Sequence, residues 1–120
     1  MIQTTNTKPY DLEERTAIFA ESCRDFVKSL PKILSNFEYS KQLIRSSGSQ
    51  AANYIEANES LSKKDFCHWI KICRKETKES CLWLRLCEVE DKNFRERLLS
   101  EAIELRKIFS AILDKSLWTV

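Results

Sequence analysis

The segment from residue 62 to residue 88 carries more apolar surface than a single core-facing helix needs. At about 100° per residue its apolar side chains cover an arc of about 220°, roughly twice the stripe of an ordinary surface helix. They are Phe66, Trp69, Ile70, Ile72, Cys73, Cys81, Trp83, Leu84, Leu86 and Cys87. The apolar surface beyond one core-facing stripe must also be buried against something.

Three further stretches have helical spacing. The 120 residues include one Gly and two Pro, which is typical of long helices joined by short loops. We expect helices over residues 11–30, 36–59 and 62–88 and from residue 91 onward. The expected N-caps are Asp11, Ser62 and Asp91, and Pro31 is a stop signal. Short connections make sequential helices antiparallel, so the predicted fold is an all-α, up-down-up-down four-helix bundle over residues 10–117, preceded by a disordered tail, residues 1–9.

Candidate core positions follow from the helical spacing. In the first helix they are Leu12, Phe19, Cys23, Phe26, Val27 and Leu30, and in the last they are Phe94, Leu98, Ala102, Leu105, Phe109 and Ile112. In the second helix they are Phe37, Leu43, Ile44, Ala51 and Ile55. The middle of the second helix disfavours helical structure, because Gly48 costs about 1 kcal/mol relative to Ala. We interpret residues 47–52 as a tight helix crossing, with a kink as the alternative.

The charged residues of segment 62–88 sort by sign around the helix. An arc of roughly 100° contains no acid and six cations. These are Lys64, Lys71, Arg74, Lys75, Lys78 and Arg85. The formal net charge is only +2, so the prediction that the protein binds RNA or DNA depends on this stripe alone. A solvated face, or a face that meets an acidic protein, is the alternative interpretation.

The surplus apolar arc predicts self-association. We assign the interface of a homo-oligomer to the second and third helices, through the side chains beyond the core stripe. They are Trp69, Ile72, Trp83 and Leu86. An apolar patch of that width left in water would be an aggregation hazard.

A set of polar residues has two interpretations. Ser49, Asn53 and Glu56 lie at i, i+4 and i+7 and share one face of the second helix, while Glu76 and Glu79 lie on the apolar side of the third. Two carboxylates can act as a general acid and base. We favour a structural role, in which buried polar groups bond across helices and fix register, because a catalytic pair would need a pocket. With no nucleophile and base in a suitable pattern, we assign no catalytic residue and do not expect an enzyme.

The cysteines bear on location and on metal binding. They are odd in number, and the N-terminal residues have no apolar run of the signal-peptide type, so we expect a reducing, cytoplasmic environment. No uncharged apolar run has the roughly 20 residues of a membrane-spanning helix. No Cys-x2-Cys pair is present, so we expect small buried hydrophobic residues and neither a metal nor another cofactor. Cys67 is the exception, because its position falls within the basic arc.

Several stretches are similar to a known family. YDLEERT, LIRSSGSQAANYIEANES and KKDFCHWIKICRKETKESCLWLRL resemble the four-helix-bundle proteins encoded within intervening sequences of bacterial 23S ribosomal RNA genes. The most specific pattern is Ser-x3-Asn-x2-Glu at residues 49–56, followed by Lys-Glu-x2-Glu-x3-Trp-Leu at residues 75–84. Many relatives have a Gly after the motif Glu, where this chain has Ala57 and Asn58, and an Arg near Lys63.

The resemblance implies a bacterial protein and a ring-like homo-oligomer, with a pentamer favoured. It implies no established activity. A similar fold occurs in accessory proteins of diversity-generating retroelements, which partner a reverse transcriptase and present basic surfaces. By this analogy of fold, a nucleic-acid enzyme is a further expected partner.

Overall fold

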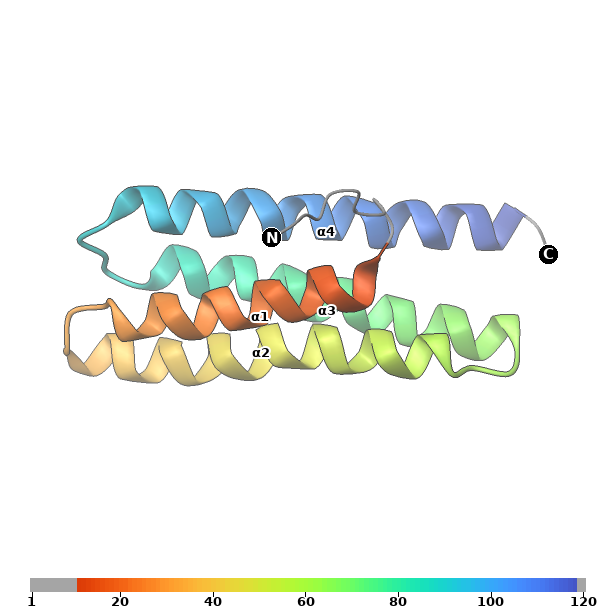
Figure 1. The fold of residues 1–120 in the computed structure, drawn as a ribbon, viewed down its shortest axis with the longest axis horizontal. Coiled ribbons are helices and arrows are strands. Elements are labelled where there is room, and N and C mark those ends of the chain that lie inside the picture. Colours follow the sequence, from red (N-terminus) through yellow and green to blue (C-terminus); the bar gives the residue numbers. More distant parts are fainter. Residues whose placement is uncertain (1–10, 119–120) are drawn as a thin grey trace.

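The computed structural model describes residues 11–118, with side chains for residues 11–116. Its helices are α1 (Leu12–Lys28), α2 (Leu34–Asn58), α3 (Lys63–Leu86) and α4 (Lys92–Trp118). They lie side by side, with the α1–α2 and α3–α4 connections at one end of the bundle and the α2–α3 connection at the other (Figure 1). The packed pairs are α1–α2, α2–α3, α3–α4 and α1–α4. The predicted all-α, up-down-up-down bundle is therefore confirmed, while the predicted tail, residues 1–9, lies outside the described residues.

The predicted N-caps of α1, α3 and α4 are present. In each, a side-chain oxygen accepts a hydrogen bond from the backbone N–H three residues later, which satisfies one of the free amides of the first turn. The bonds are Glu14 N to Asp11 Oδ1 at 3.3 Å, Asp65 N to Ser62 Oγ at 3.1 Å and Phe94 N to Asp91 Oδ1 at 3.1 Å. Helix α2 begins after Ile33 without a side-chain cap.

The core is built mainly by α1, α3 and α4. The predicted stripes of α1 and α4 are buried, apart from half-buried Val27, Phe94 and Ile112. From α3 the buried apolar residues are Cys67, Ile70, Cys73, Cys81 and Leu84. The rings of Phe26 and Phe94 meet edge to face with their centroids 5.4 Å apart. Helix α1 is also joined to α4 on the surface, where Arg15 donates to both carboxylate oxygens of Glu101 at 2.7 and 2.9 Å.

The core positions predicted for α2 are largely wrong. Leu43 is buried, but Phe37, Ile44 and Ile55 are 50%, 46% and 50% exposed. The inner side of α2 is instead formed by small and polar side chains together with Leu43. These are Asn36, Ser46, Ser47, Gln50 and Ala57. The helix is thus rotated relative to the expected orientation, with much of its hydrocarbon on the outside.

Hydrogen bonds explain why polar side chains occupy the inner side of α2. The hydroxyl groups of Ser46 and Ser80 lie 2.7 Å apart across the α2–α3 contact. Gln50 Nε2 donates to the carbonyl oxygen of Thr16 in α1 at 2.9 Å. Because buried polar groups are costly when unpaired, such bonds favour this one orientation of α2.

Asn36 ties together the two connections at one end of the bundle. Its Nδ2 donates to the carbonyl oxygens of Pro31 and Glu88, each at 3.0 Å, and its Oδ1 accepts from the N–H of Glu88 at 2.9 Å. The α1–α2 turn and the α3–α4 turn are therefore held against each other by one buried side chain.

Gly48 does not mark the predicted tight crossing. The helix α2 continues through it, and a Cβ added there would have no atom within 4 Å, while neighbouring Ser46 and Ser47 are buried. The close approach is made by the serines before the glycine. Among the described residues, no helix is both long and apolar enough to cross a membrane.

Gly48→Ala should raise the free energy of unfolding by about 0.5–1 kcal/mol, because Ala restricts the unfolded chain and meets nothing in the folded one. Urea denaturation at fixed protein concentration measures the change. Ser46→Ala is the control on the buried side of the same turn. It should lower the free energy of unfolding by about 1 kcal/mol, because the hydroxyl of Ser80 loses its partner on α2 and keeps only the carbonyl oxygen of Glu76. If Gly48→Ala instead lowers the free energy of unfolding, the space around Gly48 is not open.

Candidate nucleic-acid interface

Cations from α3 and α4 gather along the seam between these two helices. They line two adjoining hollows of about 830 and 480 Å³, which share Lys75, Lys78 and Arg106. We call the two hollows together the basic groove. Its cations are Lys71, Arg74, Lys75, Lys78 and Arg85 of α3 and Arg106 and Lys107 of α4.

Most of these cations have no counter-ion among the residues that the structure describes. Within the described residues, Lys71, Lys78, Arg85 and Arg106 form no ion pair. The two lysine pairs that exist are long, at 3.9 Å from Lys75 Nζ to Glu76 and 3.7 Å from Lys107 Nζ to Glu104. Arg74 donates to the hydroxyl of Ser110 at 3.4 Å. The groove is therefore a concentration of positive charge with little local neutralisation.

The predicted basic stripe is mostly, but not wholly, reproduced. Five of its six residues line the groove, whereas exposed Lys64 lines neither hollow. The groove also contains acids, since Glu79 and Asp114 line its two parts, so the expected face without acids is not purely basic.

Sequence reasoning missed the contribution of α4. Arg106 and Lys107 are separated from the α3 stripe by about twenty residues or more, and only the antiparallel α3–α4 packing brings them to the same seam. The available signal was a pair of adjacent cations in a helix that packs directly on α3.

Cys67 differs from the sequence expectation, and Cys81 lies at the basic groove. Cys67 is buried rather than displayed on the basic face. Cys81 lines one of the hollows. Burial raises the pKa of the Cys81 thiol, and the neighbouring Arg106 guanidinium opposes that shift without reversing it. The Cys81 thiol therefore stays protonated at neutral pH, which is unsuited to nucleophilic attack.

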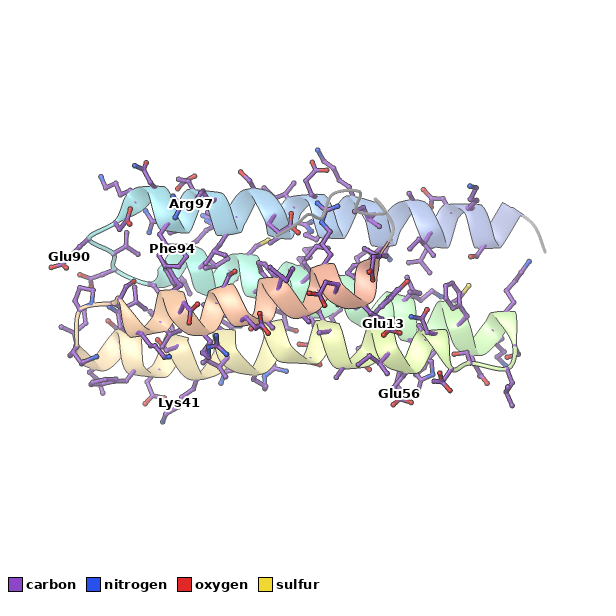
Figure 2. All side chains as sticks on the ribbon, viewed as in Figure 1. Glu13, Lys41, Glu56, Glu90, Phe94 and Arg97 are labelled. Atoms are coloured by element: carbon purple, nitrogen blue, oxygen red, sulfur yellow. The ribbon has the colours of Figure 1, made fainter. Side chains whose placement is uncertain are left out.

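The polar motif of α2 does not meet the carboxylates of α3. Asn53 Nδ2 donates to the carbonyl and hydroxyl oxygens of Ser49 at 2.8 and 3.0 Å, so this bond stays within α2. Glu56 is exposed and points away from the bundle (Figure 2). The prediction that Ser49, Asn53 and Glu56 bond across helices is not supported by these contacts.

Arg45 makes the cross-helix contact instead. Its Nη1 lies 3.1 Å from Glu76 Oε1 and its Nη2 lies 2.8 Å from Glu79 Oε1. Glu76 is only 6% exposed, so the guanidinium compensates a nearly buried carboxylate. This geometry places Glu76 and Glu79 in an ion-pair cluster that joins α2 to α3, the kind of contact we expected from other residues of α2.

Two of the four side chains assigned to an oligomer interface, Trp69 and Trp83, have partners within one chain. Trp83 stacks on Tyr39 of α2 with ring centroids 6.1 Å apart, and half-buried Trp69 packs against the core. Ile72 is half-buried and Leu86 is 41% exposed. Part of the surplus apolar arc is therefore used inside the bundle, and the assignment of these residues to an interface stays a prediction.

The cysteines are free and buried. Burial raises the pKa of both Cys23 and Cys73 to about 12. Across residues 11–116, no group of three or more His, Cys, Asp or Glu side chains is placed to hold a metal ion.

The fold and the groove define a class: an all-α bundle of four antiparallel helices with a basic seam between the third and the fourth. The profile of the 23S rRNA-intervening sequence proteins matches residues 10–111. The chain therefore belongs to the 23S rRNA-intervening sequence protein family.

A solved structure supports this assignment. The crystal structure of a protein with unknown function from the S23 ribosomal protein family of Bacteroides thetaiotaomicron superposes with a TM-score of 0.77. The two chains are 28% identical, and the match covers 85% of this chain and 97% of that one. A search of curated proteins finds no match.

Arg45→Ala should lower the free energy of unfolding by about 1–3 kcal/mol, because it leaves the buried Glu76 carboxylate without its main partner. Lys107→Ala, which removes an exposed ion pair, should change it by less than about 0.5 kcal/mol. Chemical denaturation compares the two. If the double variant Arg45→Ala, Glu76→Gln recovers none of the loss, the cluster is not the cause.

Cys23 and Cys73 should resist alkylation in the folded protein at pH 8. The raised pKa keeps both thiols protonated at that pH, and burial excludes the reagent. Peptide mass spectrometry after iodoacetamide treatment measures the modification at each site. Unfolding in urea should expose all five cysteines. Rapid modification of Cys23 without denaturant would show that the core around it opens readily.

Proposed function

We propose that this protein is a non-catalytic, homo-oligomeric scaffold that binds RNA or DNA through the basic groove. The observation that carries the proposal is the gathering of seven cations from two helices along one seam, most of them without a counter-ion on the described protein. Phosphate groups of a nucleic acid would supply the missing negative charge.

The energetics of the groove support a polyanionic partner. Lys71, Lys75 and Lys78 recur at i, i+4 and i+7, and like charges at such spacing destabilise a helix by about 0.2–0.5 kcal/mol per pair. A bound chain of phosphates would relieve that repulsion at several positions at once. A single small anion would relieve it at only one or two.

The lining of the groove favours contact with the phosphate backbone. No aromatic side chain is among the described residues that line it, so bases have no ring on which to stack. Flexible lysine side chains meet phosphates without distinguishing bases. Binding should therefore vary little with sequence and fall steeply with salt.

Assembly of several copies would strengthen weak contacts of this kind. Each copy adds a groove, and linked grooves that engage one nucleic-acid chain bind it with higher avidity than any single groove. We propose a ring, and a pentamer is favoured by the family resemblance.

A protein-interaction role without nucleic acid is the second candidate. It is favoured by the half-exposed apolar side chains of α2, because such side chains on an isolated bundle are typical of protein interfaces. The partner would be a second copy or a nucleic-acid enzyme such as a reverse transcriptase. A raised 260/280 nm absorbance ratio of the purified protein would favour the nucleic-acid role over this one.

The triple variant Lys71→Glu, Lys75→Glu, Lys78→Glu should lose binding to a mixed-sequence RNA or DNA oligonucleotide while keeping the oligomer, because the three exposed side chains lie away from the core. For the wild type, the slope of log K against log salt should be about −5 to −6 if all seven cations of the groove meet phosphates. Gel-shift titration at several salt concentrations measures both quantities.

The control for this experiment is the triple variant Lys92→Glu, Arg97→Glu, Lys115→Glu. It makes the same change in net charge at exposed positions of α4 that do not line the basic groove. It should weaken binding far less. If the two triple variants bind alike, or if the Lys71, Lys75, Lys78 variant binds as well as wild type, the basic groove is not the binding site.

A further inference from the structure

Helix α2 displays apolar side chains on its outer face. Leu34 is 77% exposed, and Phe37, Ile44 and Ile55 are each about half exposed. A helix at the surface of an isolated bundle normally turns such side chains inward. This outer face is not explained by the packing of a single chain.

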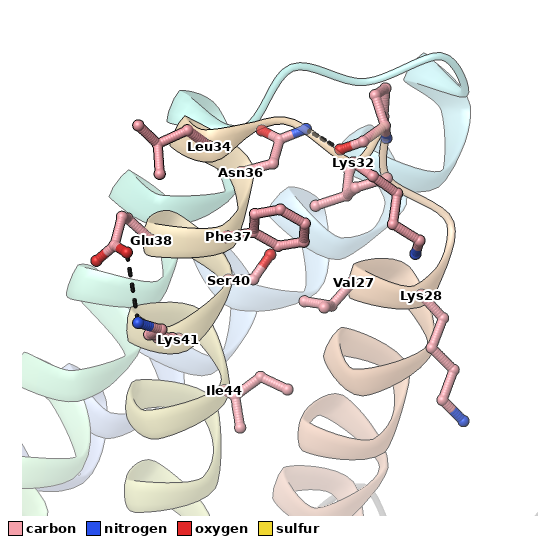
Figure 3. Close-up of a pocket in the computed structure, with 12 residues that line it drawn as sticks. Val27, Lys28, Lys32, Leu34, Asn36, Phe37, Glu38, Ser40, Lys41 and Ile44 are labelled. Carbon is pink, nitrogen blue, oxygen red and sulfur yellow. Dashed lines mark hydrogen bonds and ion pairs between the residues drawn. The ribbon is translucent and has the colours of Figure 1, made fainter.

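Part of the outer face borders a hollow between α1 and α2. The hollow has a volume of about 900 Å³ and lies beside the α1–α2 turn. Val27 of α1 and Phe37 and Ile44 of α2 point into the space between the two helices (Figure 3). Its lining also includes the exposed side chains of Lys28, Lys32 and Lys41, and exposed Glu38, which pairs with Lys41 at 3.4 Å. The α1–α2 groove, as we call it, therefore has an apolar floor and a rim of net positive charge, on which Lys28 and Lys32 form no ion pair within the described residues.

The outer face of α1 has the opposite character. Glu14, Ile18, Glu21 and Asp25 follow one another at spacings of four, three and four residues, so they share one side of the helix, and all are exposed. Lys28, three residues after Asp25, ends this side and borders the α1–α2 groove. Ile18 is 49% exposed. Within the described residues, Glu14 and Glu21 form no ion pair, and Asp25 pairs only with its neighbour Arg24. We call these four residues the acidic face.

We infer that the α1–α2 groove receives the acidic face of a second copy of this chain. Ile18 of one copy would pack on the apolar floor, and Glu21 and Asp25 would meet the lysines of the rim. Burial of hydrocarbon supplies the attraction, and the complementary charges set the orientation. This inference rests on the proposed homo-oligomer but is independent of nucleic-acid binding.

A second copy is favoured over a foreign partner because the same chain carries both complementary surfaces. A foreign acidic helix would cover the groove and leave the acidic face of α1 unexplained. The contact joins two different patches, so it is head-to-tail rather than two-fold symmetric. Because both patches involve α1, they lie on adjacent sides of the bundle, and each copy is turned relative to the last. Repetition of such a contact closes a ring when the successive rotations add up to a full turn, as in the proposed ring, and otherwise gives an open filament.

Charge reversal tests the pairing. The groove variant is Lys28→Glu, Lys32→Glu, the face variant is Glu21→Lys, Asp25→Lys, and the combined variant carries all four changes. Each pair alone sets like charges against each other and should raise the concentration at which the assembly dissociates by about tenfold or more. The combined variant exchanges the signs and should restore association. Multi-angle light scattering over a dilution series gives the mass, in multiples of 14.1 kDa.

Phe37→Ser tests the apolar part of the contact. The side chain is half exposed in one chain, so the variant should fold, with a helical circular dichroism spectrum like that of wild type. It should nevertheless dissociate at higher concentration than wild type. The control is Leu61→Ser, which alters a fully exposed side chain between α2 and α3 and should leave the mass unchanged. Leu86→Ser tests the alternative interface on α2 and α3 that the sequence predicts.

Other results would overturn the inference in distinguishable ways. If the wild-type protein is monomeric at tens of micromolar, both the proposed oligomer and this interface are ruled out. If the wild type assembles and the groove and face variants have the same assembly mass as the wild type, only this interface is ruled out. Dissociation by Leu86→Ser but not Phe37→Ser would place the contact on the α2–α3 side. Rescue of the face variant by Lys71→Glu, Lys75→Glu, Lys78→Glu would show that the acidic face docks on the basic groove.

Discussion

The orientation of α2 is the constraint on which the rest of the structure depends, and polar contacts set it. The inner side of this helix contributes little hydrocarbon, so its position is determined by directional bonds. Asn36 holds both turns at one end, the Ser46–Ser80 contact fixes the α2–α3 approach, and Gln50 reaches the backbone of α1. Burial of hydrocarbon is non-directional, whereas each of these bonds needs its donor and acceptor within a narrow range of distances and angles.

That orientation determines what the surface displays. With small and polar side chains turned inward, Phe37, Ile44 and Ile55 face outward, and the apolar patch at the α1–α2 seam follows directly. The same arrangement lets α3 pack on α2 through Trp83 and the Arg45 cluster, which leaves the basic side of α3 beside α4. The polar side chains on the inner side of α2 thus account for both the apolar surface at the α1–α2 seam and the basic surface at the α3–α4 seam.

The sequence predicts most of the bundle because α1, α3 and α4 each carry hydrocarbon at core spacing with polar residues opposite. It misleads for α2 because two stripes compete there. Phe37, Ile44 and Ile55 have core spacing, but so do Asn36, Leu43 and Gln50, and only the contacts offered by other helices decide between them. Only the α3 side of the basic groove could be predicted, for a similar reason. The α3 stripe is visible in one helix, whereas Arg106 joins it only through the register of α4.

The two surfaces lie on opposite sides of the bundle. In the cyclic order α1, α2, α3, α4, the α1–α2 seam is across from the α3–α4 seam, since the helix backbones of the described residues pack closely only between neighbours in this order. Across the core, the ring of Tyr54 in α2 meets that of Phe109 in α4 with centroids 6.2 Å apart. Copies that associate through the α1–α2 groove would therefore leave each basic groove open. Closed rotational symmetry would also give every groove the same relation to the ring axis. The cations would then repeat at regular intervals around the assembly, and a long polyanion could meet several grooves in succession where a short one meets a single groove.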